Sequence, residues 1–108
     1  MIYTNISSKE DVQNYVNYWK ISVEKIDKTH WKIKDKCLNE WILFFESVNE
    51  WRISTEDFYI YFYFEKDEFN IYKVITKNRT YTSDKYMKKY APLCCQITSL
   101  IKYKYIKF

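Results

Sequence analysis

Apolar residues in the first quarter of the chain recur at the spacing of one helix face. The series lies between positions 12 and 26 and consists of Val12, Tyr15, Val16, Trp19, Val23 and Ile26. Serines stand at positions 7 and 8, and an acidic residue follows three positions after each, which is the spacing of a capping box at a helix start. The pattern predicts a helix over residues 8–27.

A second apolar series with the same spacing predicts a helix over residues 36–51. Its members are Cys37, Leu38, Trp41, Ile42, Phe45 and Val48, with Phe44 and Trp51 beside them. A stripe of this width is typical of a helix that is buried on most sides. The residues before it leave two alternatives open: Thr29 could cap a helix through Trp31, or Trp31 and Ile33 could alternate in a short strand.

The period of the pattern changes from helical to alternating after Glu56. One side of the next segment carries Phe58, Ile60, Phe62 and Phe64, and the other carries Tyr59, Tyr61 and Tyr63. The polar residues 65–68 separate it from a second segment rich in strand-forming residues, so we predict a hairpin of strands over residues 57–65 and 69–77. Because no glycine is available for a two-residue turn, we expect a four-residue loop around a type I turn.

The last part of the chain predicts a third helix, over residues 83–101. It begins at a cap formed by Thr82 or Ser83, and Pro92 kinks it or starts a fresh turn. We expect the tail, residues 102–108, to be the fraying end of this helix or an edge strand. These elements predict a single α+β domain in which helices pack on a small antiparallel sheet built around the hairpin. The expected core consists of Val12, Val16, Trp19, Leu38, Trp41, Ile42, Phe45, Phe58, Ile60, Phe62, Ile71 and Ile97.

The chain contains no glycine, although about 7% of the residues in an average protein are glycine. Phosphate-binding loops, dinucleotide-binding fingerprints and nucleophile elbows need glycine where the backbone turns sharply or touches a ligand, so the sequence excludes these classes of site. Other residues with GC-rich codons are also scarce, which indicates an AT-rich genome. The abundance of lysine and tyrosine is therefore partly a result of base composition.

Length and composition favour one small domain of a soluble protein. The chain has 108 residues, of which 47% are hydrophobic. The longest uncharged run, residues 90–101, is too short to span a bilayer, and the first residues lack the pattern of a signal peptide. Three cysteines, an odd number, fit a reducing compartment. We expect a cytoplasmic protein with no membrane partner.

Candidates for catalysis or metal binding are few. His30 is the only histidine, so a catalytic triad or a histidine-based metal site would depend on it alone. Cys94 and Cys95 are adjacent, and on a helix their side chains point about 100° apart, which suits neither a redox pair nor a zinc pair. Glu46 and Glu50 would share one face of the second predicted helix as solvated carboxylates. We expect no enzymatic activity, no cofactor and no metal site.

Charge is divided unevenly along the chain, whose formal net charge is +4. Residues 1–68 carry a net charge of −4, whereas residues 69–108 carry +8. In the basic part, lysines alternate with tyrosines, a composition that suits contact with a nucleic-acid backbone together with base stacking. A small nucleic-acid-binding protein is therefore the alternative prediction, and it would use lysines such as Lys85, Lys88, Lys89, Lys102 and Lys104.

The row of tyrosines on the hairpin predicts a protein partner. Tyrosine offers a large rigid contact surface and is enriched at interface hot spots, unless a helix buries this face. Acidic residues at positions 56, 57, 65, 67 and 68 flank the row and would repel phosphate. We therefore expect a non-enzymatic inhibitor or adaptor that docks on a larger protein, or pairs as a homodimer. Its candidate binding residues are Tyr59, Tyr61 and Tyr63, together with Lys85, Lys88, Lys89, Lys102 and Lys104.

In size and composition, though not in any motif, the chain is similar to small phage and mobile-element proteins that block host defence, anti-CRISPR inhibitors among them. This likeness implies a partner inside the host cell, for example a complex that itself binds nucleic acid. It implies no particular binding residues.

Overall fold

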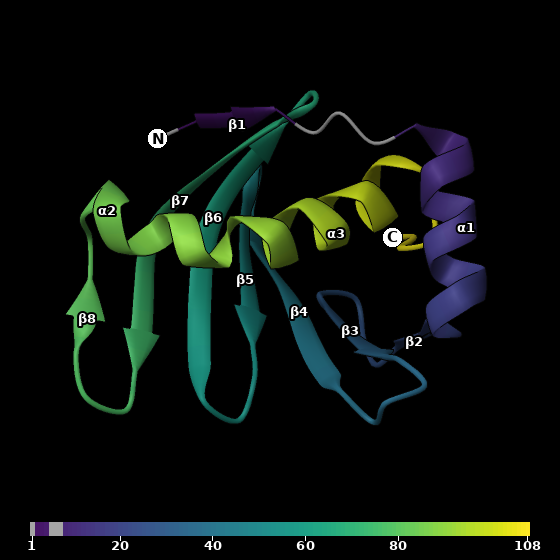
Figure 1. Cartoon of the computed structure of the whole chain (residues 1–108), viewed down its shortest axis with the longest axis horizontal. Helices are drawn as coiled ribbons and strands as arrows, with labels where there is room; N and C mark the ends of the chain where they lie inside the picture. Colours follow the sequence, from purple (N-terminus) through teal and green to yellow (C-terminus); the bar gives the residue numbers. More distant parts are fainter. Residues whose placement is uncertain (1, 5–7) are drawn as a thin grey trace.

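The chain forms an antiparallel sheet, and its helices lie on one face of that sheet (Figure 1). The computed structural model describes residues 2–4 and 8–108. In chain order the elements are β1 (Ile2–Thr4), α1 (Lys9–Trp19), β2 (Ser22–Lys25), β3 (His30–Lys34), β4 (Glu40–Ser47), β5 (Glu50–Ser54), β6 (Phe58–Glu65), β7 (Glu68–Thr76), β8 (Thr80–Tyr81), α2 (Asp84–Met87), the 3-10 helix η1 (Lys88–Tyr90) and α3 (Ala91–Lys102). An N-terminal helix and a 19-residue C-terminal helical segment pack on the sheet, which confirms the predicted α+β class.

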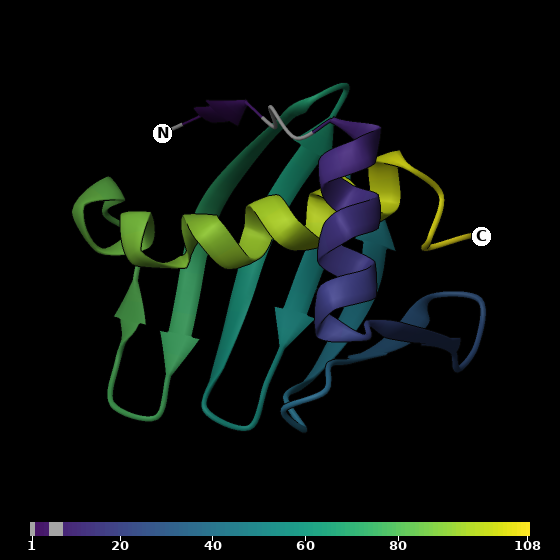
Figure 2. The same ribbon diagram turned by 45° about the vertical axis from the view of Figure 1, so that its right-hand side comes forward.

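Strands β2 to β7 lie side by side in the order in which the chain makes them. Each pairs antiparallel with the next, so this part of the sheet is a meander of hairpins. The free side of β7 pairs with β1 at one end and with β8 at the other. Figures 1 and 2 show the resulting twisted sheet behind the helices.

The predicted hairpin is present as β6 and β7, but its connection is shorter than we expected. Glu65 pairs with Glu68, which leaves a two-residue loop in place of the four-residue loop. Lys66 takes the left-handed conformation that such turns require, with φ of 55°. A tight turn therefore forms without glycine, because Lys66 adopts the positive φ that glycine usually supplies.

The predicted helix over residues 36–51 is wrong, because this part of the chain forms β4 and the start of β5. Strand β4 is apolar on both faces. Leu43 points into the core, whereas Ile42 and Phe44 lie on the other face. A strand with two apolar faces matches a helical spacing by accident, and the strand alternative for Trp31 and Ile33 is the correct one.

The helix predicted over residues 8–27 begins where expected, but it ends earlier than predicted. Ser8 and Asp11 form the capping box. The helix stops at Trp19, because Lys20 turns the backbone into the left-handed region with φ of 52°. Val23 then belongs to β2.

The helical segment from Asp84 to Lys102 crosses the sheet and matches the predicted third helix (Figures 1 and 2). Pro92 lies in the first turn of α3, where a missing backbone N–H costs nothing. The tail is neither helix nor strand, contrary to expectation. It turns back under the helix, and Ile106 is buried. The Trp31 indole Nε1 donates a hydrogen bond of 3.0 Å to the Lys107 carbonyl of the tail.

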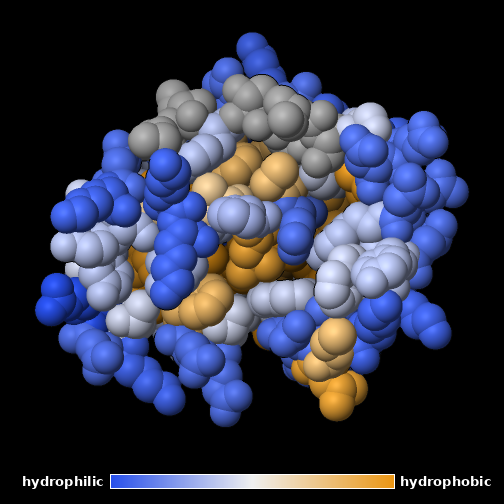
Figure 3. All heavy atoms as spheres, in the orientation of Figure 1, coloured by the Kyte–Doolittle hydropathy of each residue, from blue (hydrophilic) through white to orange (hydrophobic). Residues whose placement is uncertain are grey.

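The core lies between the helices and the inner face of the sheet, and Figure 3 shows apolar atoms in the middle of the helix-bearing side, with hydrophilic atoms around them. The predicted core residues that are fully buried are Val12, Ile60, Phe62, Ile71 and Ile97. Those that are partly buried and pack against the core are Val16, Trp41, Phe45 and Phe58. Three predictions are wrong: Leu38 is 91% exposed, Trp19 lies near the surface, and Ile42 belongs to the opposite face.

No helix in the described part of the chain is both long enough and apolar enough to cross a membrane.

Candidate functional site

None of the described residues, 2–4 and 8–108, covers the face of the sheet that points away from the helices (Figure 2). We call it the outer face. Because side chains alternate along each strand, the residues opposite the core positions of β3 to β7 all project there. An antiparallel sheet with one face in water usually carries small polar residues on that side. Here charged residues on the face alternate with five large aromatic residues, Phe44, Tyr59, Tyr61, Tyr63 and Tyr72.

A registered row of rings and cations crosses the outer face. The row runs over five strands and consists of His30, Phe44, Arg52, Tyr61 and Lys73, each paired in register with the next. The His30 and Phe44 rings lie 4.4 Å apart, and the Arg52 guanidinium lies 4.6 Å from the Phe44 ring. The Lys73 ammonium lies 4.3 Å from the Tyr61 ring. We call these five residues the cation–aromatic row.

Arg52 stands at the centre of this row. Its guanidinium lies 6.0 Å or less from the rings of Tyr59 and Tyr61 as well as near Phe44. Its Nη1 makes an ion pair of 3.1 Å with Glu46 on β4. Its Nε is buried and makes no hydrogen bond within the described structure. Stacking and one ion pair thus hold a planar cation in a fixed orientation beneath the tyrosines.

The three predicted tyrosines lie on the outer face, and no helix covers them in the described structure. Tyr59 is 45% exposed and Tyr63 is 41% exposed, whereas Tyr61 is half-buried between Arg52 and Lys73. The alternative, that a helix buries this face, is therefore wrong. Tyr63 stacks on Tyr72 of β7, with 4.6 Å between ring centroids.

Sequence reasoning did not place Tyr72, Phe44, Arg52 or Lys73 at this site. A bulge between Tyr61 and Phe62 shifts the register with β7 and brings Tyr72 beside Tyr63. Burial, and then the neighbouring Tyr63, Glu50 and Glu46, raise the pKa of Tyr72, so its hydroxyl stays protonated and can donate. A strand interpretation of residues 40–54 would have placed Phe44 and Arg52 on this face, but the helical interpretation hid them.

Charge on the outer face is balanced between cations and carboxylates. Lys32 and Lys34 approach Glu40 at 3.8 and 3.9 Å, and Arg52 pairs with Glu46. The prediction that Glu46 shares a helix face with Glu50 is wrong, since Glu46 is in β4 and Glu50 begins β5. A face with this balance has no excess of positive charge to attract a phosphate backbone.

The predicted lysines belong to the C-terminal helical segment and its end, and they fall into two groups. Lys85, Lys88 and Lys89 lie on α2 and η1, at the start of the C-terminal helical segment. Lys102 and Lys104 lie at its end, about 20 Å away at the usual helical rise. A hydrogen bond from Lys102 to Asp67, whose atoms lie 3.2 Å apart, raises the pKa of that lysine. All five belong to the helical side of the molecule, so the structure brings neither group together with Tyr59, Tyr61 and Tyr63.

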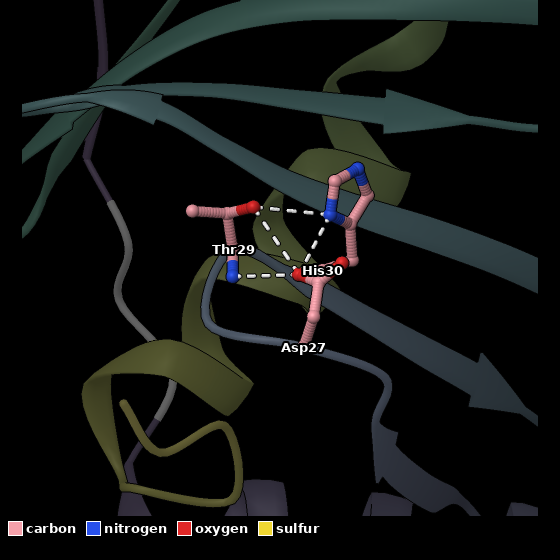
Figure 4. Close-up of polar contacts among 3 residues, drawn as sticks. All are labelled: Asp27, Thr29 and His30. Atoms are coloured by element: carbon pink, nitrogen blue, oxygen red, sulfur yellow. Dashed lines mark hydrogen bonds and ion pairs between the residues drawn. The ribbon is translucent and has the colours of Figure 1, made fainter.

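His30 takes part in a turn that joins β2 to β3 (Figure 4). Its Nδ1 lies 2.8 Å from Asp27 Oδ1 and 3.0 Å from Thr29 Oγ1. Asp27 Oδ1 also accepts the Thr29 backbone N–H at 2.8 Å, and this bond, followed by the contact with His30, holds the pKa of Asp27 below its usual range. In a catalytic triad the hydroxyl and the carboxylate use different ring nitrogens, whereas here both approach Nδ1. The geometry is that of a side-chain-stabilised turn.

The cysteines are separate free thiols. Cys37 is exposed, Cys94 is buried and Cys95 is intermediate. Burial, and to a lesser extent Cys95, raises the pKa of the Cys94 thiol well above its usual value. Within residues 2–4 and 8–108, no three His, Cys, Asp or Glu side chains gather in a way that could hold a metal ion.

Comparisons with known proteins found no family model, no curated protein and no solved structure that matches this chain.

Proposed function

We propose that this protein is a non-enzymatic binding protein, an inhibitor or adaptor, that docks on a larger protein through its outer face. The observation that carries the proposal is the cation–aromatic row with the exposed tyrosines beside it. Tyr and Arg are the residues most enriched in interface hot spots, and here they are held rigidly on strands. A rigid aromatic surface loses little side-chain entropy when a partner covers it.

The balance of charge favours a protein over a nucleic acid as the partner. Carboxylates lie within ion-pair distance of Lys32, Lys34 and Arg52, so a phosphate backbone would meet acidic groups beside each of these cations. Five basic residues of the last 40 positions, Lys85, Lys88, Lys89, Lys102 and Lys104, lie in two separate groups on the helical side of the molecule, and Lys73 is on the outer face. Direct nucleic-acid binding therefore stays the second candidate, and the experiment below includes it.

Small size, an amino-acid composition poor in residues with GC-rich codons, and the absence of catalytic motifs fit an anti-defence protein of a phage or mobile element, acting in the cytoplasm of a host cell. On this proposal the partner is a host protein complex, for instance one that handles nucleic acid. The inhibitor works by occupying a surface and carries out no reaction.

The test compares two matched pairs of tyrosine substitutions in affinity capture from a host lysate. One variant is Tyr59→Ala with Tyr63→Ala on the outer face, and the control is Tyr18→Ala with Tyr86→Ala on the helices, where both tyrosines are also exposed. Captured proteins are identified by mass spectrometry, and the purified partner is titrated by calorimetry. We expect the outer-face variant to lose more than about 2 kcal/mol of binding free energy, a weakening of about 30-fold, and the control to bind as the wild type does.

Equal losses in both variants would refute docking through the outer face. A gel-shift titration with single- and double-stranded DNA and RNA at about 0.15 M salt tests the second candidate. Sub-micromolar binding there would rank nucleic acid above protein as the partner.

A further inference from the structure

A groove opens at the end of the sheet where the β3–β4 and β5–β6 connections lie side by side. Its volume is about 700 Å³, and residues of both connections line it. The apolar part of its lining includes Trp41, Ile42 and Phe58, and the acidic part consists of Glu40, Glu56 and Asp57. Through Ile42 and Tyr59 the groove continues onto the outer face.

Leu38 lines this groove from an ordered turn. The side chain is 91% exposed, and the backbone is held in the left-handed region with φ of 66°. Asp35 fixes the turn: its Oδ1 accepts the backbone N–H groups of Cys37 at 2.8 Å and Asn39 at 3.0 Å, and its Oδ2 accepts the Asn39 side-chain amide at 3.0 Å. A large apolar side chain is thus presented to solvent by a preorganised loop, which is the arrangement of an interface anchor.

The opposite wall of the groove is also a fixed turn. Thr55 Oγ1 accepts the backbone N–H groups of Asp57 at 3.2 Å and Phe58 at 3.1 Å, and the Thr55 backbone N–H donates to the Phe58 carbonyl at 2.9 Å. These bonds set the positions of Glu56 and Asp57 at the tip of the turn. Neither wall has to become ordered when a ligand enters.

The groove is acidic in a protein whose net charge is positive. Its lining contains three carboxylates and no lysine or arginine. Lys77 approaches Asp57 only at 3.9 Å, with both side chains at least 75% exposed, so water screens this pair strongly. Among the described residues, no ion pair is formed by Glu56. Glu40 pairs with Lys32 and Lys34, so the charge available to a basic ligand is that of Glu56 and Asp57.

We propose that the groove receives a segment of a partner protein in which an aliphatic or aromatic side chain stands next to lysine or arginine. The apolar side chain would pack against Leu38, Trp41 and Phe58, and the basic group would reach Glu56 and Asp57. The inference rests on the proposed protein-binding function and adds the chemistry of the segment that is bound. Leu38, Glu56 and Asp57 lie outside the cation–aromatic row, whereas Tyr59 lines the groove and also belongs to the outer face, so Tyr63 is the residue that separates the two proposals.

The probe is a random library of roughly 12-residue peptides displayed on phage and selected on the wild-type protein. We expect the selected peptides to be enriched in lysine or arginine beside an apolar residue. A synthetic peptide of the selected sequence is then titrated against a variant with Glu56→Gln and Asp57→Asn, against Leu38→Ser, and against a control with Glu65→Gln and Glu68→Gln. The control removes the same charge from the hairpin end of the sheet, far from the groove.

We expect about tenfold weaker binding by the Glu56/Asp57 variant, with a smaller dependence on salt, and weaker binding by Leu38→Ser as well. Binding by the Glu65/Glu68 control should match the wild type. Selected peptides without basic residues, or equal losses in the Glu56/Asp57 variant and in its control, would overturn the inference.

A Tyr63→Ala variant separates this inference from the proposed function, because Tyr63 lies at the other end of β6. We expect this variant to bind the selected peptide with unchanged affinity. If the peptide binds but no captured partner depends on the outer-face tyrosines, the groove stands and docking through the outer face fails. If a partner depends on those tyrosines and the library yields no basic peptides, the groove fails and the proposed function stands.

Discussion

Replacing Trp31 with phenylalanine should destabilise the protein by about 2–3 kcal/mol. The indole is 1% exposed and lies 5.9 Å from the Trp51 ring and 5.4 Å from the Phe108 ring. Its Nε1 donates to the Lys107 carbonyl. The lost hydrogen bond accounts for about 1 kcal/mol, and the cavity left by the missing ring atoms accounts for about 1–2 kcal/mol.

The measurement is urea unfolding followed by far-UV circular dichroism, which does not depend on the number of tryptophans. Trp19→Phe is the matched control, because Trp19 is 36% exposed and should lose less than about 0.5 kcal/mol. In a chain without residues 107–108, Trp31→Phe should cause a much smaller loss of unfolding free energy, because the Lys107 carbonyl and the Phe108 ring that contact the indole are then absent. If the Trp31 and Trp19 variants unfold at the same urea concentration, the tail does not dock on Trp31.

Two further predictions concern the half-buried phenol of Tyr15 and the turn at Lys66. Burial, and to a lesser extent Asp35, raises the pKa of Tyr15 to about 12, above the usual value of 10.0. The contribution of the Tyr15 hydroxyl to stability is therefore complete below pH 10 and is lost as the pH rises through 12. Over this range the urea midpoint of unfolding should fall more steeply in the wild type than in Tyr15→Phe. Equal slopes in the two proteins would contradict this prediction. Lys66→Gly should raise the melting temperature, since glycine adopts the observed φ of 55° without a Cβ clash, whereas Lys77→Gly, at a loop position without positive φ, should lower it. Differential scanning calorimetry of both variants decides the second prediction, and a reversed order would refute it.

Two of the places where sequence reasoning failed share one physical cause, the absence of glycine. Helices usually end at a glycine in the left-handed conformation, and tight hairpins usually contain one. In this chain Lys20 ends α1 and Lys66 makes the hairpin turn, and neither residue type signals a break. The first predicted helix therefore ran on into β2. Where the signal was alternation, as in β6, the prediction was correct.

Sequence reasoning identified only part of the candidate site. The three tyrosines of β6 were identifiable because strict alternation separates them from the buried Phe and Ile residues. Phe44 comes from a strand that was assigned to a helix, Arg52 follows directly after the end of that predicted helix, and Tyr72 reaches the site through a bulge. The cation–aromatic row is created by the pairing of five strands, and the residue pattern within one strand does not reveal which residues of the neighbouring strands it pairs with. The separation of the lysines likewise depends on how the helical segment crosses the sheet.

The open outer face also has a consequence for how this protein can evolve. Because side chains alternate, each strand has one set of positions that maintains the core and another set that does not. Substitutions at exposed positions such as Tyr59 and Tyr63 leave the core intact and remove cross-strand contacts worth about 0.2–1 kcal/mol each, so selection can act on them at a limited cost to folding. Variants of this domain can therefore follow a partner whose surface changes, or move to a different partner, while the inner half of every strand remains the same.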